Sequence, residues 1–130
     1  MIVDTSALLA IFLAEPERRQ FLEAITQAET RRISAVNALE TGIVLEARRG
    51  EAAGREFDLF LHHAQIEMVP ADSEQVEIVR IAWRKYGKGR HAAGLNFGDC
   101  FAYALAKVMS EPILFKGDDF AHTDLEIAAS

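Results

Sequence analysis

The sequence has little cysteine and lacks long apolar runs. Its single cysteine, Cys100, excludes an internal disulfide and a cysteine-ligated zinc cluster. No apolar stretch approaches the roughly 20 residues that span a bilayer. The short run at residues 7–14 lacks the basic flank and the cleavage site of a signal peptide. We therefore expect a cytoplasmic protein with no membrane segment.

Basic charge is also scarce. Fourteen lysines and arginines stand against 20 acidic residues, which gives a formal charge of −6. This balance argues against a protein that binds nucleic acid by overall charge alone. The chain shows no internal repeat, and its three prolines and eight glycines are scattered, without a linker-like cluster. With 50% hydrophobic residues, the sequence predicts a single folded domain over residues 1–130.

Short apolar segments alternate with longer amphipathic ones. The pattern predicts strands at residues 2–3, 32–34, 66–69 and 112–115. It predicts helices at residues 6–13, 17–29, 35–50, 52–63, 72–87 and 96–109. Such alternation implies crossover connections and therefore an α/β fold, a three-layer α/β/α sandwich with a central parallel sheet.

Acidic residues fall at one predicted edge of this sheet. Asp4 directly follows the first strand, and Asp118 and Asp119 follow the last. Glu40 and Asp99 lie near the beginnings of helices, which start on the same edge. Ligands of open parallel sheets bind at the carboxyl ends of the strands. Convergent carboxylates need a cation to stay ionised, and oxygen ligands suit Mg²⁺ or Mn²⁺.

Each acid also has a purely structural interpretation. Asp4 is a good helix cap. Asp99 stands three residues after Asn96, which is the spacing of a capping box. Glu40 can pair with arginines of its own helix, and aspartates are common in turns such as the one after the last strand. The acids point to a site only through their expected convergence.

Four segments of the chain, in order, resemble the motifs of PIN domains. They read IVDTSAL from residue 2, ISA from residue 33 with LE at 39–40, NFGDC from residue 96, and LFKGDDF from residue 114. The match runs along the whole chain and is similar to VapC-type toxins of bacterial toxin–antitoxin pairs.

The resemblance implies a metal-dependent endoribonuclease with Mg²⁺ as its cofactor and Mn²⁺ as a substitute. Asp4, Glu40 and Asp99 carry over as the catalytic acids, with Asp4 and Asp99 as metal ligands. The fourth acid is left open between Asp118 and Asp119. The resemblance also implies an RNA substrate, a homodimer and a cognate VapB-type antitoxin as partner.

Substrate contacts are expected at two places. Thr5 and Ser6 follow the first acid, where they would bond a phosphate oxygen or a water on the metal, although helix capping explains them equally well. The segment 80–91 is basic and contains no acid, and its Lys88 and Arg90 are placed to hold an RNA backbone. The alternative is a solvated charged face. Trp83 is interpreted as core or dimer surface.

Competing functions make different demands on the sequence. A receiver domain has a lysine after its last strand, and Lys116 stands at such a position. Its phosphoacceptor aspartate should end the middle strand, but the aspartate found there, Asp72, resembles a helix cap. A haloacid-dehalogenase-like phosphatase needs a second aspartate two residues after the first, but position 6 of this chain is Ser6, which argues against that function. A non-catalytic binding protein, whose acids are only caps, remains the third alternative.

Overall fold

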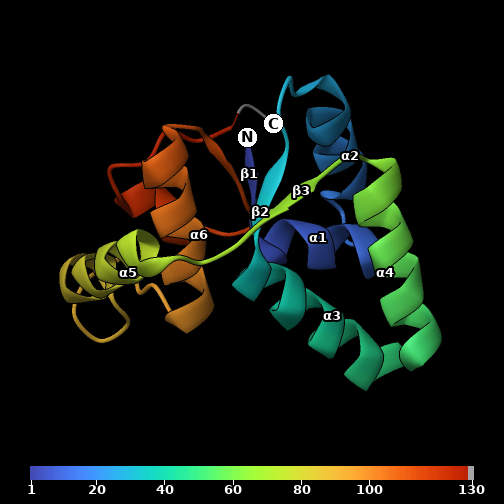
Figure 1. Ribbon diagram of the computed structural model, residues 1–130, viewed down its shortest axis with the longest axis horizontal. Helices are drawn as coiled ribbons and strands as arrows, with labels where there is room; N and C mark the ends of the chain where they lie inside the picture. Colours follow the sequence, from blue (N-terminus) through green and yellow to red (C-terminus); the bar gives the residue numbers. More distant parts are fainter. Residues whose placement is uncertain (129–130) are drawn as a thin grey trace.

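Four short parallel strands lie at the centre of the molecule (Figure 1). The computed structural model describes residues 1–128. The strands are β1 (Ile2–Val3), β2 (Arg32–Ser34), β3 (Glu67–Val69) and β4 (Ile113–Leu114), in the sheet order β3-β2-β1-β4. Every neighbouring pair is parallel, which confirms the predicted sheet. β3 and β4 are shorter than predicted, since ladder pairing stops before the flanking apolar residues.

The helices follow the predicted order, with ends that differ by a residue or two. They are α1 (Thr5–Phe12), α2 (Arg18–Gln27), α3 (Ala35–Arg49), α4 (Glu51–His63), α5 (Ser73–Tyr86) and α6 (Phe97–Met109), followed by the 3₁₀ turn η1 (Asp119–His122). Polar side chains cap four of these helices and fix where they begin: Asp4 for α1, Ser34 for α3, Asp72 for α5 and Asn96 for α6. No helix within residues 1–128 has both the length and the apolar character needed to cross a membrane.

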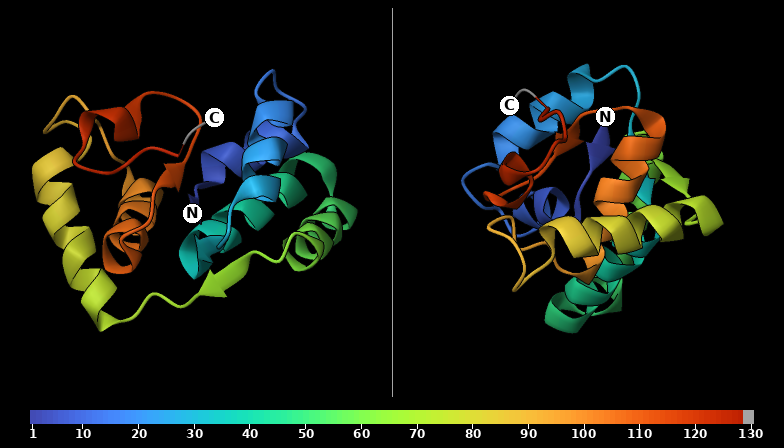
Figure 2. Two further views of the ribbon diagram at one scale, coloured as in Figure 1. Left: turned by 90° about the horizontal axis from the view of Figure 1, so that it is seen from above. Right: turned by 90° about the vertical axis from the view of Figure 1, so that its left-hand side faces the viewer.

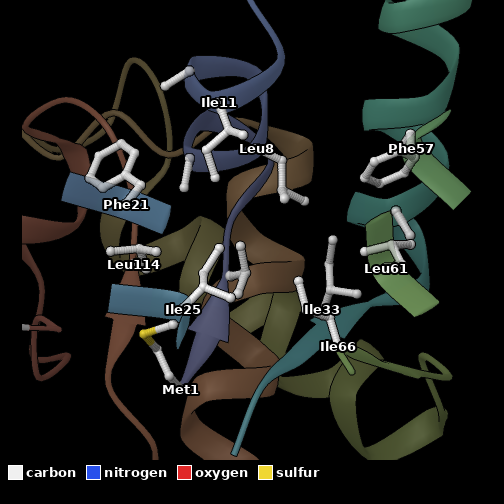
Figure 3. Packing of buried hydrophobic residues seen from close by; sticks show 14 of the residues in the cluster. Met1, Leu8, Ile11, Phe21, Ile25, Ile33, Phe57, Leu61, Ile66 and Leu114 are labelled. Carbon is white, nitrogen blue, oxygen red and sulfur yellow. The ribbon is translucent and has the colours of Figure 1, made fainter. Parts of the chain in front are cut away.

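β1 and its neighbour at the sheet edge, β4, send alternate side chains to opposite helix layers. Ile2 pairs with Ile113 in register, and both pack in the cluster formed with α5 and α6. Val3 pairs with Leu114, and both pack in the cluster formed with α1 to α4 (Figure 3). Figure 2 shows the same division into layers, which confirms the α/β/α arrangement. The sheet thus places its carboxyl edge between α1, α3 and α6, which all begin there.

Candidate active site

Asp4 is the buried centre of the acidic cluster. It lies between β1 and α1 with 2% of its surface exposed. Its Oδ2 accepts hydrogen bonds from the Ser6 backbone N–H at 3.0 Å and from the Ser6 hydroxyl at 2.6 Å. Its Oδ1 is buried without a partner among the described residues. Burial raises the pKa of Asp4 and the charge of Glu40 raises it further, and the hydrogen bonds from Ser6, which lower the pKa, offset these effects only in part.

Glu40 reaches the same place from α3. Its Oε1 accepts a 2.7 Å hydrogen bond from the Thr5 hydroxyl. On the other side it lies against α6, since a Cβ built on Gly98 would stand only 2.7 Å from Glu40 Oε1. A side chain at position 98 would therefore push Glu40 out of place, and the glycine permits the close approach of α3 and α6.

Asp99 satisfies both interpretations made from the sequence. Its Oδ2 accepts from the Asn96 backbone N–H at 3.0 Å, and its own N–H donates to Asn96 Oδ1 at 2.8 Å, which completes the capping box. It also faces the other acids. Burial, followed by the negative charge of Asp4, raises the pKa of Asp99 to about 7, with smaller effects of Asp119 and Glu40. Capping thus fixes the carboxylate beside the cluster.

The two aspartates after β4 occupy different environments. Asp118 is 83% exposed, and its Oδ2 lies 2.8 Å from Nε2 of His122. Asp119 begins η1, near enough for its charge to raise the pKa of Asp99. The structure therefore brings Asp119 toward the acids and leaves Asp118 paired with a histidine on the surface.

The hydroxyls predicted to contact substrate are engaged with the acids. The Thr5 hydroxyl donates to Glu40, as described above. The Ser6 hydroxyl donates to Asp4 and accepts from the backbone N–H of Lys116 at 2.9 Å. Ser6 thereby ties the turn after β4 to the end of β1. The Lys116 ammonium itself pairs with Glu15 at 2.9 Å and Glu17 at 3.5 Å, rather than with the acidic cluster.

Sequence reasoning missed Asn37. This residue is fully buried on α3, three residues before Glu40, and its side-chain amide donates a 3.0 Å hydrogen bond to the Gly98 carbonyl. Its backbone carbonyl accepts from Thr5 at 3.3 Å and from Thr41 at 2.8 Å. The sequence spacing could have identified Asn37, because residues three positions apart on a helix, such as Asn37 and Glu40, lie on the same face.

The predicted basic contacts lie on the loop before α6. Lys88 and Arg90 are both exposed. The loop is closed at its base by hydrogen bonds from Leu95 N–H to the Tyr86 carbonyl and from Lys88 N–H to the Leu95 carbonyl, both 2.9 Å. The Arg90 guanidinium lies 4.4 Å from the centre of the Trp83 ring. These cations are therefore displayed on a closed turn that leads into the helix carrying Asp99.

The donor set fits a hard divalent cation. Among the residues that the structure describes, no three His, Cys, Asp or Glu side chains are already grouped closely enough to hold one ion. The carboxylates are nevertheless neighbours, and the buried Asp4 Oδ1 has no protein partner. An unpaired carboxylate oxygen in an apolar setting is costly, and a cation bound there removes that cost. Carboxylate oxygens suit Mg²⁺ or Mn²⁺.

Comparisons with known proteins show the family and the fold of this chain. The PIN domain family model matches residues 1–126. Ribonuclease VapC30 of Mycobacterium tuberculosis (strain ATCC 25618 / H37Rv) is 50% identical over 129 residues, covering 99% of this chain and 98% of that protein.

Two solved structures share the fold. The crystal structure of Mycobacterium tuberculosis VapC20, described as a sarcin–ricin loop cleaving toxin, superimposes with a TM-score of 0.78 at 15% identity, covering 95% of both chains. A toxin–antitoxin complex from Klebsiella pneumoniae gives a TM-score of 0.71 at 18% identity, with 95% of this chain and 92% of that chain covered.

Proposed function

The chain belongs to the PIN domain family, and on that basis we propose that it is a metal-dependent endoribonuclease that hydrolyses RNA phosphodiester bonds. The observation that carries the proposal is the convergence of Asp4, Glu40 and Asp99 around an unpartnered, buried carboxylate oxygen. The relative that is 50% identical over almost its whole length is named a ribonuclease, which supports the same activity.

We assign Asp4 and Asp99 as ligands of Mg²⁺, for which Mn²⁺ can substitute, and Glu40 and Asp119 as the acids that complete the negative site. A divalent cation bound there supplies charge neutralisation on the phosphate and activation of the attacking water. The chain itself supplies orientation. Ser6 holds the Asp4 carboxylate, Thr5 holds that of Glu40, and the capping box holds that of Asp99.

The basic loop gives this acidic protein a local place for RNA. Lys88 and Arg90 carry positive charge on the turn that leads directly into α6. Phosphate contacts are local and salt-dependent, so such a cluster can act within a protein of net charge −6. We assign these two residues to the RNA backbone near the cleaved bond.

We further propose that residues 1–130 form one domain that acts in the cytoplasm as the toxin of a toxin–antitoxin pair. The Klebsiella pneumoniae toxin–antitoxin complex with the same fold supports an antitoxin as partner, and the relative named VapC30 supports an antitoxin of the VapB type. An antitoxin side chain of positive charge, placed among the acids, would compete with the metal. We also propose a homodimer, because Leu39 (65%) and Ile43 (59%) of α3 are exposed next to each other along the helix. A purely monomeric protein in light scattering would overturn the dimer.

The activity is tested with Asp4→Asn and Asp99→Asn. Both variants should lose RNA cleavage in excess Mg²⁺ while keeping the fold, as judged by circular dichroism. Asp58→Asn, which removes an exposed carboxylate from α4, is the matched control and should cleave like the wild type. Mg²⁺ should raise the melting temperature of the wild type and of Asp58→Asn only. Nearly full cleavage by either site variant, or a wild type without a Mg²⁺ response, contradicts the proposal.

A further inference from the structure

Two exposed aromatic side chains line one hollow beside the candidate site. Trp83 on α5 is 50% exposed, and Phe97 at the start of α6 is 74% exposed. The hollow they share measures about 470 Å³, and its floor includes the buried residues Leu95 and Cys100. This volume falls within the range of roughly 300–1,000 Å³ that is usual for small-molecule sites. The aromatic planes therefore border a space large enough for a ring-shaped ligand.

The charge around the hollow is of one sign. Arg80 and Lys88 line it together with Asn96, and no acidic residue does so. Neither cation forms an ion pair within residues 1–128. Arg90 adds a third positive group above the Trp83 ring. In a chain of net charge −6, this concentration of unpaired cations favours an anionic occupant.

The first turn of α6 contributes both to the hollow and to the acidic cluster. Asn96 lines the hollow, and its backbone N–H donates to the Asp99 carboxylate. Phe97 is the next residue, and its ring is held against Phe101 with the ring centres 5.1 Å apart. Because Asp99 and the lining residues Asn96, Phe97 and Cys100 share one helical turn, we expect an RNA strand with one phosphate at the acids to bring a neighbouring nucleotide to this hollow.

We propose that the hollow is a nucleobase subsite that receives an unpaired base of the RNA next to the cleaved phosphodiester. The base stacks on Trp83 and Phe97, while Arg80 and Lys88 contact the flanking phosphates. This inference rests on the proposed ribonuclease function. Single-stranded RNA is recognised by stacking on aromatic side chains combined with cationic contacts to its backbone, the combination present here. The exposure of Trp83 also overturns the interpretation of this residue as core and leaves the dimer surface as the competing prediction.

The sole tryptophan of the chain makes the proposal measurable. Short single-stranded RNA oligonucleotides, added in EDTA so that they stay intact, should quench the fluorescence of Trp83. Counterparts with one abasic position should bind more weakly when that position is the stacked one. Removal of one stacking contact between a base and a side chain is expected to lower RNA affinity by between about 5-fold and 150-fold.

Substitutions at Phe97 separate stacking from simple apolar burial. Phe97→Leu keeps an apolar side chain but loses one of the two aromatic planes, so RNA affinity should fall, by a smaller factor than for the abasic oligonucleotide. Phe97→Tyr should retain wild-type affinity. Phe97→Leu should also discriminate less between intact and abasic RNA than the wild type does, because the base keeps only the Trp83 ring to stack on. Leu59→Ala, at an exposed apolar residue of α4, is the control and should bind like the wild type.

Two outcomes overturn the subsite. One is equal binding of intact and abasic oligonucleotides by the wild type, and the other is unchanged RNA affinity of Phe97→Leu. If self-association of Phe97→Leu changes in sedimentation while its RNA affinity does not, a second copy of the chain covers the hollow instead. Cleavage of a long RNA by the wild type in Mg²⁺, lost in Asp99→Asn, is measured alongside. If the wild type cleaves this RNA but the subsite tests give a contradicting result, the nucleobase subsite is wrong and the proposed ribonuclease function stands.

Discussion

The side-chain amide of Asn37 donates a 3.0 Å hydrogen bond to the backbone carbonyl of Gly98, which joins α3 to α6 at the acidic cluster. Glu40 follows Asn37 by one helical turn, and Asp99 follows Gly98 directly. A Cβ at Gly98 would stand 2.7 Å from Glu40 Oε1, so the carboxylate of Glu40 packs directly against the start of α6. We infer that the hydrogen bond of Asn37 helps to set the spacing between the carboxylates of Glu40 and Asp99.

Asn37→Ala should therefore raise the Mg²⁺ concentration needed for half-maximal RNA cleavage. The matched control is Gln75→Ala, because Gln75 is also buried, donates its amide to a backbone carbonyl (Pro70, 3.1 Å) and has an unpartnered oxygen. Both variants should lose about 1–3 kcal/mol of unfolding free energy in urea titrations. Equal Mg²⁺ requirements in the two variants would show that Asn37 serves stability alone.

Asp119→Asn should reduce cleavage by about 10- to 100-fold, as expected for a group that supports metal ligands. The reason is its proximity to Asp99, whose pKa it raises. Asp118→Asn should remain close to wild type, because its carboxylate is exposed and pairs with His122. Single-turnover cleavage assays at saturating Mg²⁺ compare the two. If Asp118→Asn loses more cleavage than Asp119→Asn, then Asp118 is the fourth catalytic acid.

The double variant Lys88→Ala/Arg90→Ala should bind RNA more weakly and with a flatter salt dependence. The slope of log affinity against log salt should fall by up to about two phosphate contacts. Turnover at saturating RNA should change little, since neither residue is assigned to the metal. Arg19→Ala/Arg55→Ala removes the same charge from α2 and α4 and serves as control. An unchanged slope in the loop variant would place the RNA path elsewhere.

Glu111→Gln should destabilise the fold in a pH-dependent manner. Burial raises the pKa of Glu111, but hydrogen bonds from the N-terminal ammonium and Thr30, together with the charges of the N-terminus and Arg32, outweigh burial and hold it below 4.5. Because the pKa of Glu111 is lower in the folded state than in the unfolded state, the ionised carboxylate stabilises the fold at any pH above its unfolded-state pKa. This stabilisation is lost as the pH falls through the folded-state pKa. The variant should lose about 2 kcal/mol at pH 7 and much less at pH 3.

Denaturant titrations at the two pH values measure this difference. Glu67→Gln is the control, because Glu67 shares Arg32 as its partner but is 67% exposed and should contribute little. A loss at Glu111 that is the same at pH 7 and pH 3 would mean that packing, and not charge, explains it.

The sequence by itself determined the order of the elements and the family. Asp72 and Asn96 cap their helices through side-chain bonds that span three residues, so local spacing was enough to find them. Asp4 ends a strand within the first four residues, and its place at the carboxyl edge follows from parallel pairing.

Only the tertiary structure decided what these residues contact. Asp118 and Asp119 are indistinguishable in a turn, and their separation depends on where the distant residue Asp99 lies. The importance of Asn37 depends on a hydrogen bond to a residue 61 positions away. Trp83 carries the same helical spacing as core residues, and it is exposed because no other segment within residues 1–128 covers its ring fully. Caps and periodicity arise between near neighbours in the chain, whereas burial and the meeting of charges arise between segments that only folding brings together.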